Sequence, residues 1–125
     1  MIAKYFKKVE NNLDENSHFI EDFLINKQTF TKEKGTIEGE VFFNDESRMD
    51  FMEAVNTSKK GKDKYSYHYM DKEKEMIFRY DNAKHHREIK TIPHHKHTPK
   101  GIIESSEPNL NQILGEVEKN IMNEH

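Results

Sequence analysis

Residues 78–99 (FRYDNAKHHREIKTIPHHKHTP) contain most of the side chains in this sequence that could do chemistry. Five of the eight histidines lie here, as a pair at 85–86 and a group at 94, 95 and 97. An imidazole changes charge close to neutral pH, so it can donate a proton, accept one or bind a metal with little tuning. Arg79 and Asp81 lie just before the first pair. We therefore expect the function of the protein to depend on this segment.

One interpretation of these residues is acid–base chemistry on RNA, without a cofactor. Such cleavage needs one group that takes the 2′-hydroxyl proton, another that protonates the leaving oxygen, and cations beside the charged transition state. Histidines can fill both proton roles, Arg79 is the best candidate for phosphate contact, and Asp81 could orient a histidine through its ring N–H. The candidate catalytic residues are His68, Arg79, Asp81, His85, His86, His94, His95 and His97. The candidate RNA-binding residues, cations for phosphate and tyrosines for base stacking, are Lys84, Arg87, Lys96, Tyr67 and Tyr80.

A second interpretation is a metal site. In an extended backbone His95 and His97 would point the same way, and His94 would point away from them. The alternative ligand set for zinc or nickel is His85, His95, His97 and Asp81. The chain lacks both an HExxH motif and any cysteine, the two signals that most strongly indicate zinc. A third interpretation is a solvated polar loop with no function of its own.

The composition narrows the class of protein. The 125 residues are 33% hydrophobic and 34% charged, with a mean hydropathy of −1.06, so the core is expected to be thin and self-association as a homodimer is left open. The net charge of −3 excludes a global basic field, although residues 84–100 carry five cations and one acid. Without cysteine there are no disulfides. Neither a membrane span nor a signal peptide is evident, and we expect a cytoplasmic protein.

The elements that must position these side chains follow from the periodicity. Apolar residues at helical spacing predict a helix over 2–13 and another over about 107–123, with a serine of 105–106 as its cap. Alternating runs predict strands over 18–31, 36–43 and 48–55, and a hairpin over 64–82. The proline-containing segment 83–100 is predicted to be a functional loop. We therefore predict a single α+β domain over 1–125, with an antiparallel meander sheet of about four to five strands across 18–82 between the two helices.

The predicted hairpin indicates which side chains of the candidate site share one face of the sheet. If its loop holds two or four residues, Tyr65, Tyr67 and Tyr69 share the core face with Met76, Phe78 and Tyr80. His68, Arg79 and Asp81 then lie together on the opposite face. We expect Asn82, at the end of the second strand, to have a structural role in the turn that follows.

Several runs of the sequence resemble the TumE family of toxins from prokaryotic toxin–antitoxin systems. They are residues 1–6 (MIAKYF), 39–41 (GEV), 65–69 (YSYHY), 78–83 (FRYDNA), 85–86 (HH), 93–97 (PHHKH) and 105–108 (SSEP). The resemblance covers nearly the whole chain and implies a small cytoplasmic toxin, encoded beside a helix-turn-helix antitoxin that binds and neutralises it. The ribonuclease interpretation comes from the histidines and from the habits of small toxins in general.

Two classes of function remain open from the sequence. The first is a toxin that acts as a metal-independent ribonuclease on an RNA substrate. The alternative is a non-enzymatic module that binds a metal or a protein through the histidine-rich segment. Nucleotide-transfer chemistry is disfavoured, because no phosphate-cradling glycine-rich loop is present.

Overall fold

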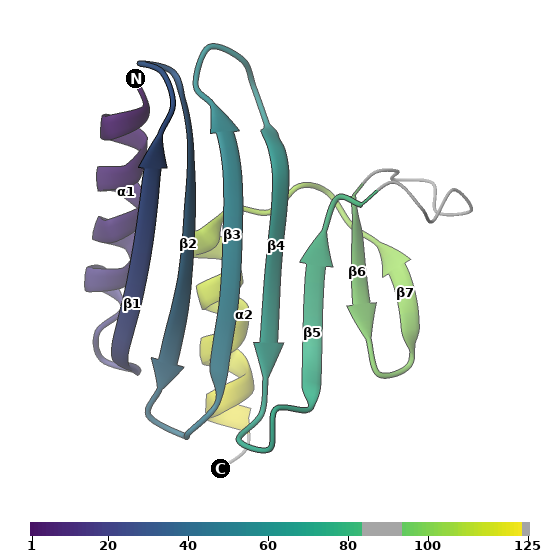
Figure 1. Cartoon of the computed structure of the whole chain (residues 1–125). Coiled ribbons are helices and arrows are strands. Elements are labelled where there is room, and N and C mark those ends of the chain that lie inside the picture. The colour runs from purple at the N-terminus through teal and green to yellow at the C-terminus, as the bar shows by residue number, and fades with distance from the viewer. Residues whose placement is uncertain (84–93, 124–125) are drawn as a thin grey trace.

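The computed structural model describes residues 1–83 and 94–123, which form two helices and one sheet (Figure 1). In chain order the elements are α1 (Ile2–Glu15), β1 (Ile20–Thr29), β2 (Lys34–Phe43), β3 (Arg48–Asn56), β4 (Lys62–Met70), β5 (Met76–Asp81), β6 (His95–Thr98), β7 (Gly101–Glu104) and α2 (Leu110–Asn123). Among the described residues, no helix is long and apolar enough to span a membrane.

The sheet is an antiparallel meander in which each strand pairs with the next along the chain. The α+β class, with a helix at each end of the chain, is confirmed, but the described sheet has seven strands rather than four to five. The difference lies in the segment predicted as loop: His95–Thr98 is β6, paired with β5 on one side and β7 on the other. The sequence does not reveal this strand, because polar side chains lie on both of its sides and no apolar–polar alternation results.

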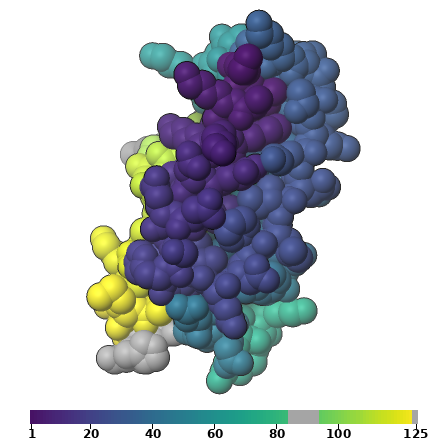
Figure 2. Space-filling view, turned by 90° about the vertical axis from the view of Figure 1, so that its left-hand side faces the viewer, coloured from purple at the N-terminus to yellow at the C-terminus, as the bar shows by residue number. Residues whose placement is uncertain are grey.

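Both helices pack on the same face of the sheet (Figure 1). Figure 2 shows the two layers from the side, with the helices, purple and yellow, to the left of the blue strands. The helical periodicity is confirmed, since the apolar stripes are buried against the sheet. The buried helix residues are Ile2, Phe6, Val9 and Leu13 in α1, and Leu110, Ile113, Leu114 and Val117 in α2.

The cap of α2 differs from the serine that we predicted. The Gln112 N–H donates to the side chain of Asn109 at 2.8 Å, and the Asn109 N–H donates to the side chain of Gln112 at 3.0 Å. This reciprocal pair is a capping box, and it starts the helix after Pro108. Glu107, just upstream, instead accepts a hydrogen bond from the backbone of Lys62 at 3.0 Å.

The β4–β5 register confirms the predicted division of the hairpin into two faces. Tyr67 pairs with Tyr80 and Tyr69 with Phe78, on the face that the helices cover. Tyr65, Tyr67 and Tyr69 are each at most 1% exposed. His68 pairs with Arg79 on the opposite face, which we call the outer face. A register shift between Tyr69 and Met70 pairs Met70 with Met76, and at this end of β5 Ile77 packs against the core in place of the predicted Met76.

One carboxylate is buried within the helix-facing core. Glu53 on β3 is 0% exposed and accepts hydrogen bonds from the hydroxyls of Tyr5 on α1 and Tyr67 on β4. Burial, and then the charge of Glu53, raises the pKa of both tyrosines, so each remains a protonated donor. These contacts connect α1 to the middle of the sheet.

Candidate active site on the outer face of the sheet

Three neighbouring strands place His68, Arg79 and His97 in one row on the outer face. His68 on β4 pairs with Arg79 on β5, and Arg79 pairs with His97 on β6. On the other side of His68 the row continues to Asp50 on β3. Adjacent strands lie about 4.8 Å apart, so side chains on neighbouring strands of this row are in reach of one another.

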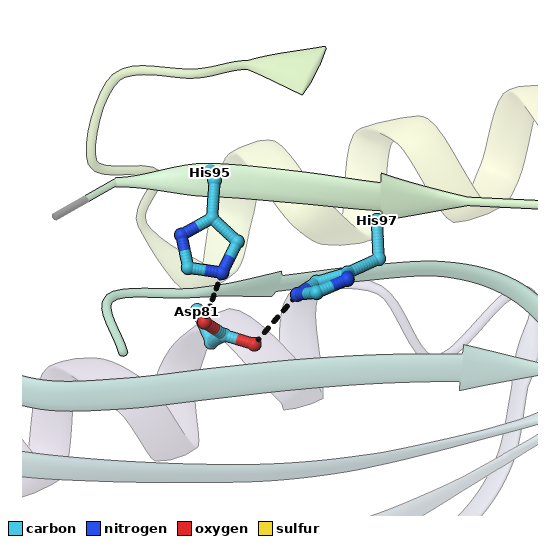
Figure 3. A group of neighbouring side chains, drawn as sticks. All are labelled: Asp81, His95 and His97. Atoms are coloured by element: carbon cyan, nitrogen blue, oxygen red, sulfur yellow. Dashed lines mark ion pairs between the residues drawn. The ribbon is translucent and has the colours of Figure 1, made fainter. Parts of the chain in front are cut away.

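Asp81 lies in the next row and contacts three members of the candidate site. One carboxylate oxygen, Oδ1, is 2.7 Å from Nε2 of His95. The other, Oδ2, is 3.2 Å from Nε2 of His97 and 3.2 Å from Nε of Arg79. Figure 3 shows both imidazoles pointing from β6 toward this one carboxylate. Asp81 also accepts a hydrogen bond from the backbone N–H of Ala83 at 3.1 Å, which fixes the carboxylate at the strand end.

The members of this group differ in their access to solvent. The side chain of His95 is 1% exposed, that of His97 is 22% exposed and that of Arg79 is 47% exposed. The two imidazole rings lie 4.8 Å apart between centroids and are nearly perpendicular. His97 and Arg79 can therefore meet a ligand from solution, whereas His95, on the same face of the sheet, is shielded from solvent.

His68 has a different electrostatic environment from the other two histidines. Its side chain is half-buried, and burial followed by the positive charge of Arg79 lowers the pKa of its imidazole, while Asp50 acts in the opposite direction. Asp50 is the weakest of these three influences, and its carboxylate also pairs with Arg48 at 2.6 Å. At neutral pH His68 is thus a neutral imidazole that can accept a proton.

A family model described as Toxin TumE matches residues 7–121, a range that contains every residue of the candidate site. The chain belongs to the TumE toxin family. Membership confirms the resemblance seen in the sequence, supports a role as a toxin and implies a cognate antitoxin. Comparisons with curated proteins and with solved structures gave no match.

Some residues predicted for the site of this TumE-family protein lie on the helix-facing side of the sheet instead. Lys96 pairs with Glu116 of α2 at 2.7 Å and lies over the ring of Tyr80, whose hydroxyl donates to the same carboxylate. Tyr67 is fully buried, so its ring cannot stack on an RNA base. These positions alternate with the outer-face residues along β4, β5 and β6 and therefore point the opposite way.

His94 also separates from its neighbour in sequence. It stacks on Tyr65, and its Nδ1 lies 2.9 Å from the tyrosine hydroxyl, whereas His95 turns to Asp81. The expected divergence of His94 from His95 and His97 is confirmed. The remaining predicted site residues, Lys84, His85, His86 and Arg87, lie outside the described residues.

Asn82 has a structural role, but its described hydrogen bonds join it to β4 rather than to the turn that follows. Its side-chain oxygen accepts the backbone N–H of Tyr65 at 3.1 Å, and its side-chain nitrogen donates to the carbonyl of Asp63 at 3.2 Å. These bonds tie the end of β5 to the start of β4. A shallow pocket opens beside this junction, and Ser66, Arg79 and Asp81 are among the residues that line it.

Sequence reasoning did not select Asp50 or Ser66, which extend the site onto β3 and β4. Asp50 pairs with His68, and Ser66 pairs with Asp81. The alternation of β3, with Met49 and Phe51 in the core, places Asp50 on the outer face. The alternation could therefore have placed Asp50 on the outer face from the sequence alone. Placing it opposite His68 also requires the β3–β4 register.

The same cluster contains the side chains best placed to hold a metal ion. Asp81, His95 and His97 each offer one ligand atom, and these atoms all lie within 4.8 Å of one another. Within residues 1–83 and 94–123 this is the group of metal-ligating side chains that the fold assembles. Three of the four residues of the predicted ligand set are therefore together, and the fourth, His85, lies outside the described residues.

Proposed function

We propose that this TumE-family protein is a toxin that cleaves RNA by metal-independent acid–base chemistry on the outer face of its sheet. The observation that carries the proposal is the row His68–Arg79–His97 across β4, β5 and β6, with Asp81 in contact with two of its members. Two histidines flank a guanidinium, which is the set of groups that phosphodiester cleavage requires.

In the proposed reaction the 2′-hydroxyl of the RNA attacks the adjacent phosphorus. His68, neutral at pH 7, accepts the hydroxyl proton, and His97 as the imidazolium donates a proton to the leaving 5′-oxygen. The P–O5′ bond breaks, and the products are a 2′,3′-cyclic phosphate and a free 5′-hydroxyl. Arg79 lies between the two histidines, where its guanidinium can bind the negative charge that develops on the phosphate oxygens.

The spacing of the row allows one histidine to act as the base and the other as the acid on the same phosphate. His68 and His97 lie on strands separated by β5, so their backbones are about 10 Å apart, and both side chains can reach a phosphate held at Arg79. The Asp81 carboxylate lies 3.2 Å from Nε2 of His97 and can hold that ring in position, and the buried His95, 2.7 Å from the other carboxylate oxygen, can hold Asp81 in turn. We therefore assign Asp81 and His95 as positioning residues rather than as groups that touch the substrate.

The experiment is a cleavage assay on a labelled single-stranded RNA, with protein purified without an affinity tag and with EDTA present. We expect cleavage in EDTA, cyclic phosphate ends, and a loss of rate of about 10²–10⁴-fold in either His97→Ala or His68→Ala.

His18→Ala is the matched control for this assay. His18 is also a histidine paired with a carboxylate, at 2.7 Å from Glu118, but it lies just before β1, far from the outer-face row. Equal cleavage by the His97→Ala, His68→Ala and His18→Ala proteins would rule out acid–base catalysis by this row.

The identity of the antitoxin is a second part of the proposal. The resemblance to the family suggests a helix-turn-helix protein, and we infer that it neutralises this toxin by direct binding. Co-expression of the neighbouring gene product, followed by purification, would show whether the two form a complex that no longer cleaves RNA.

A further inference from the structure

The Asp81, His95 and His97 cluster has the form of a preorganised three-ligand metal site. His95 and His97 are two positions apart on β6, so their side chains point the same way, and Asp81 lies directly opposite His95 on β5. Two of the three side chains are at least nine-tenths buried, and hydrogen-bonded strands hold all three backbones. Ligand atoms around a tetrahedral zinc lie about 3.3 Å apart, so small side-chain rotations would close the group around an ion.

The chemistry of the donor atoms selects a particular class of metal. Two imidazole nitrogens and one carboxylate oxygen suit zinc and other borderline divalent ions, and three such ligands leave a position for water. Magnesium prefers an octahedral shell of oxygens and is not matched by this set. The contacts of both imidazoles with the carboxylate are made through Nε2, the ring nitrogen that would coordinate the ion.

The guanidinium of Arg79 would compete with a zinc ion for the carboxylate of Asp81. Its Nε is 3.2 Å from Oδ2 of Asp81, and its side chain is 47% exposed, so it can move into solvent when a cation approaches. Zinc and the Arg79 guanidinium would both be stabilised by Asp81, and each would repel the other. Binding of zinc would therefore displace Arg79 from the position that it holds in the candidate site.

We propose that Asp81, His95 and His97 bind one zinc ion, and that the ion inactivates the site by taking His97 and displacing Arg79. The second half of this inference depends on the proposed ribonuclease function, whereas the first half does not. An imidazole whose Nε2 is bound to zinc no longer has Asp81 as its partner, and the phosphate loses the guanidinium beside it. Zinc would act as an inhibitor of the toxin rather than as its cofactor.

The binding half is tested by calorimetric titration of zinc chloride into tag-free protein that has been freed of metal with a chelator. We expect one zinc per chain for the wild type and no comparable binding of magnesium. Asp81→Asn and His95→Ala should weaken zinc binding by at least about 100-fold, because the first replaces an anionic oxygen ligand by a neutral amide and the second removes an imidazole ligand. His18→Ala, which removes a histidine from a two-residue pair, should bind zinc as the wild type does.

Arg79→Gln is a second test of zinc binding, and it can be used even if the Asp81 and His95 variants unfold. Arg79 is the most exposed residue of the group, and its replacement removes only the competing charge. We expect zinc to bind several-fold more tightly to this variant. A wild type that takes up no stoichiometric zinc, or an Arg79→Gln variant that binds zinc more weakly, would overturn the proposed site.

The inhibition half is tested by RNA cleavage with and without one equivalent of zinc. We expect zinc to stop cleavage by the wild type and a chelator to restore it. Zinc binding with unchanged cleavage would overturn the inhibition. Zinc binding by a protein that never cleaves RNA would support the site and refute the ribonuclease function, so the two failures are distinguishable.

Discussion

The carboxylate of Asp81 has partners on both of its oxygens, and its contacts join residues from two strands. One oxygen faces the buried His95, and the other faces both His97 and Arg79. Asp81 was predicted to orient a histidine, and two histidines lie within 3.2 Å of its carboxylate. Asp81 itself is buried, and its partners range from the buried His95 to the half-exposed Arg79, so one carboxylate connects a shielded histidine with side chains that solvent can reach.

At the residue scale, the pKa of His68 tests the electrostatic influence of Arg79 and Asp50, and this test does not depend on catalysis. We expect the imidazole to titrate below its ordinary pKa of 6.5, since burial and the charge of Arg79 both disfavour the protonated form. Arg79→Gln should raise this pKa, and Asp50→Asn should lower it further. Titration of the His68 ring by NMR measures all three proteins, and a lower pKa in Arg79→Gln would contradict the assigned electrostatics.

The lowered pKa of His68 also determines the sign of the pH dependence of RNA cleavage. A general base acts in its neutral form, so the rate should fall as the pH drops through the pKa of His68. In Asp50→Asn this acid limb of the profile should move to lower pH, because the carboxylate that favours the protonated form has been removed. The pH–rate profiles of the two proteins check this expectation.

At the scale of elements, β6 is what assembles the candidate site. Its pairing with β5 brings His95 opposite Asp81 and His97 opposite Arg79, although these residues are far apart in sequence. Lys96 of the same strand, and His94 just before it, face the helix side, where they contact Glu116 and Tyr65. A four-residue strand thus divides the histidine-rich run into two environments.

A second element-scale prediction concerns the attachment of α1 to the sheet. Glu53→Ala would leave the hydroxyls of the half-buried Tyr5 and the buried Tyr67 without their acceptor. We expect the free energy of unfolding to fall by about 2–4 kcal/mol, because each orphaned hydroxyl keeps its desolvation cost. Urea denaturation followed by circular dichroism measures the change.

Glu38→Ala is the matched control for that measurement. Glu38 lies on the neighbouring strand β2 but is exposed, so its replacement should change the free energy of unfolding by at most about 0.5 kcal/mol. Similar values for the two variants would show that the Glu53 contacts contribute little to the docking of α1.

At the scale of the whole molecule, the apolar core and the candidate site lie on opposite faces of the sheet. The helix-covered face contains the apolar core, and the outer face carries the row from Asp50 to His97. This separation allows substitutions of the exposed outer-face residues, such as Arg79, to change chemistry with little effect on folding. Variants of exposed site residues are therefore suitable for experiments in cells.

Growth of a bacterial host is the corresponding whole-molecule test. Expression of the wild-type toxin should slow growth, and His97→Ala should relieve most of that effect because it removes the proposed acid. His18→Ala should remain as toxic as the wild type, since His18 pairs with Glu118 away from the site. Equal toxicity of the wild-type and His97→Ala proteins would separate toxicity from the chemistry of this row.

The sequence by itself indicated both amphipathic helices and the first five strands, and it grouped His68, Arg79 and Asp81 on one face for a hairpin loop of two or four residues. These features follow from periodicities of 3.6 and 2, which are properties of a local segment. Only the tertiary structure decided that His95 and His97 join them. Strand β6 has polar side chains on both sides, so its position depends on non-local backbone pairing with β5 and β7. The chemistry of the histidines could therefore be named from the sequence, but the choice among them required the register of the sheet.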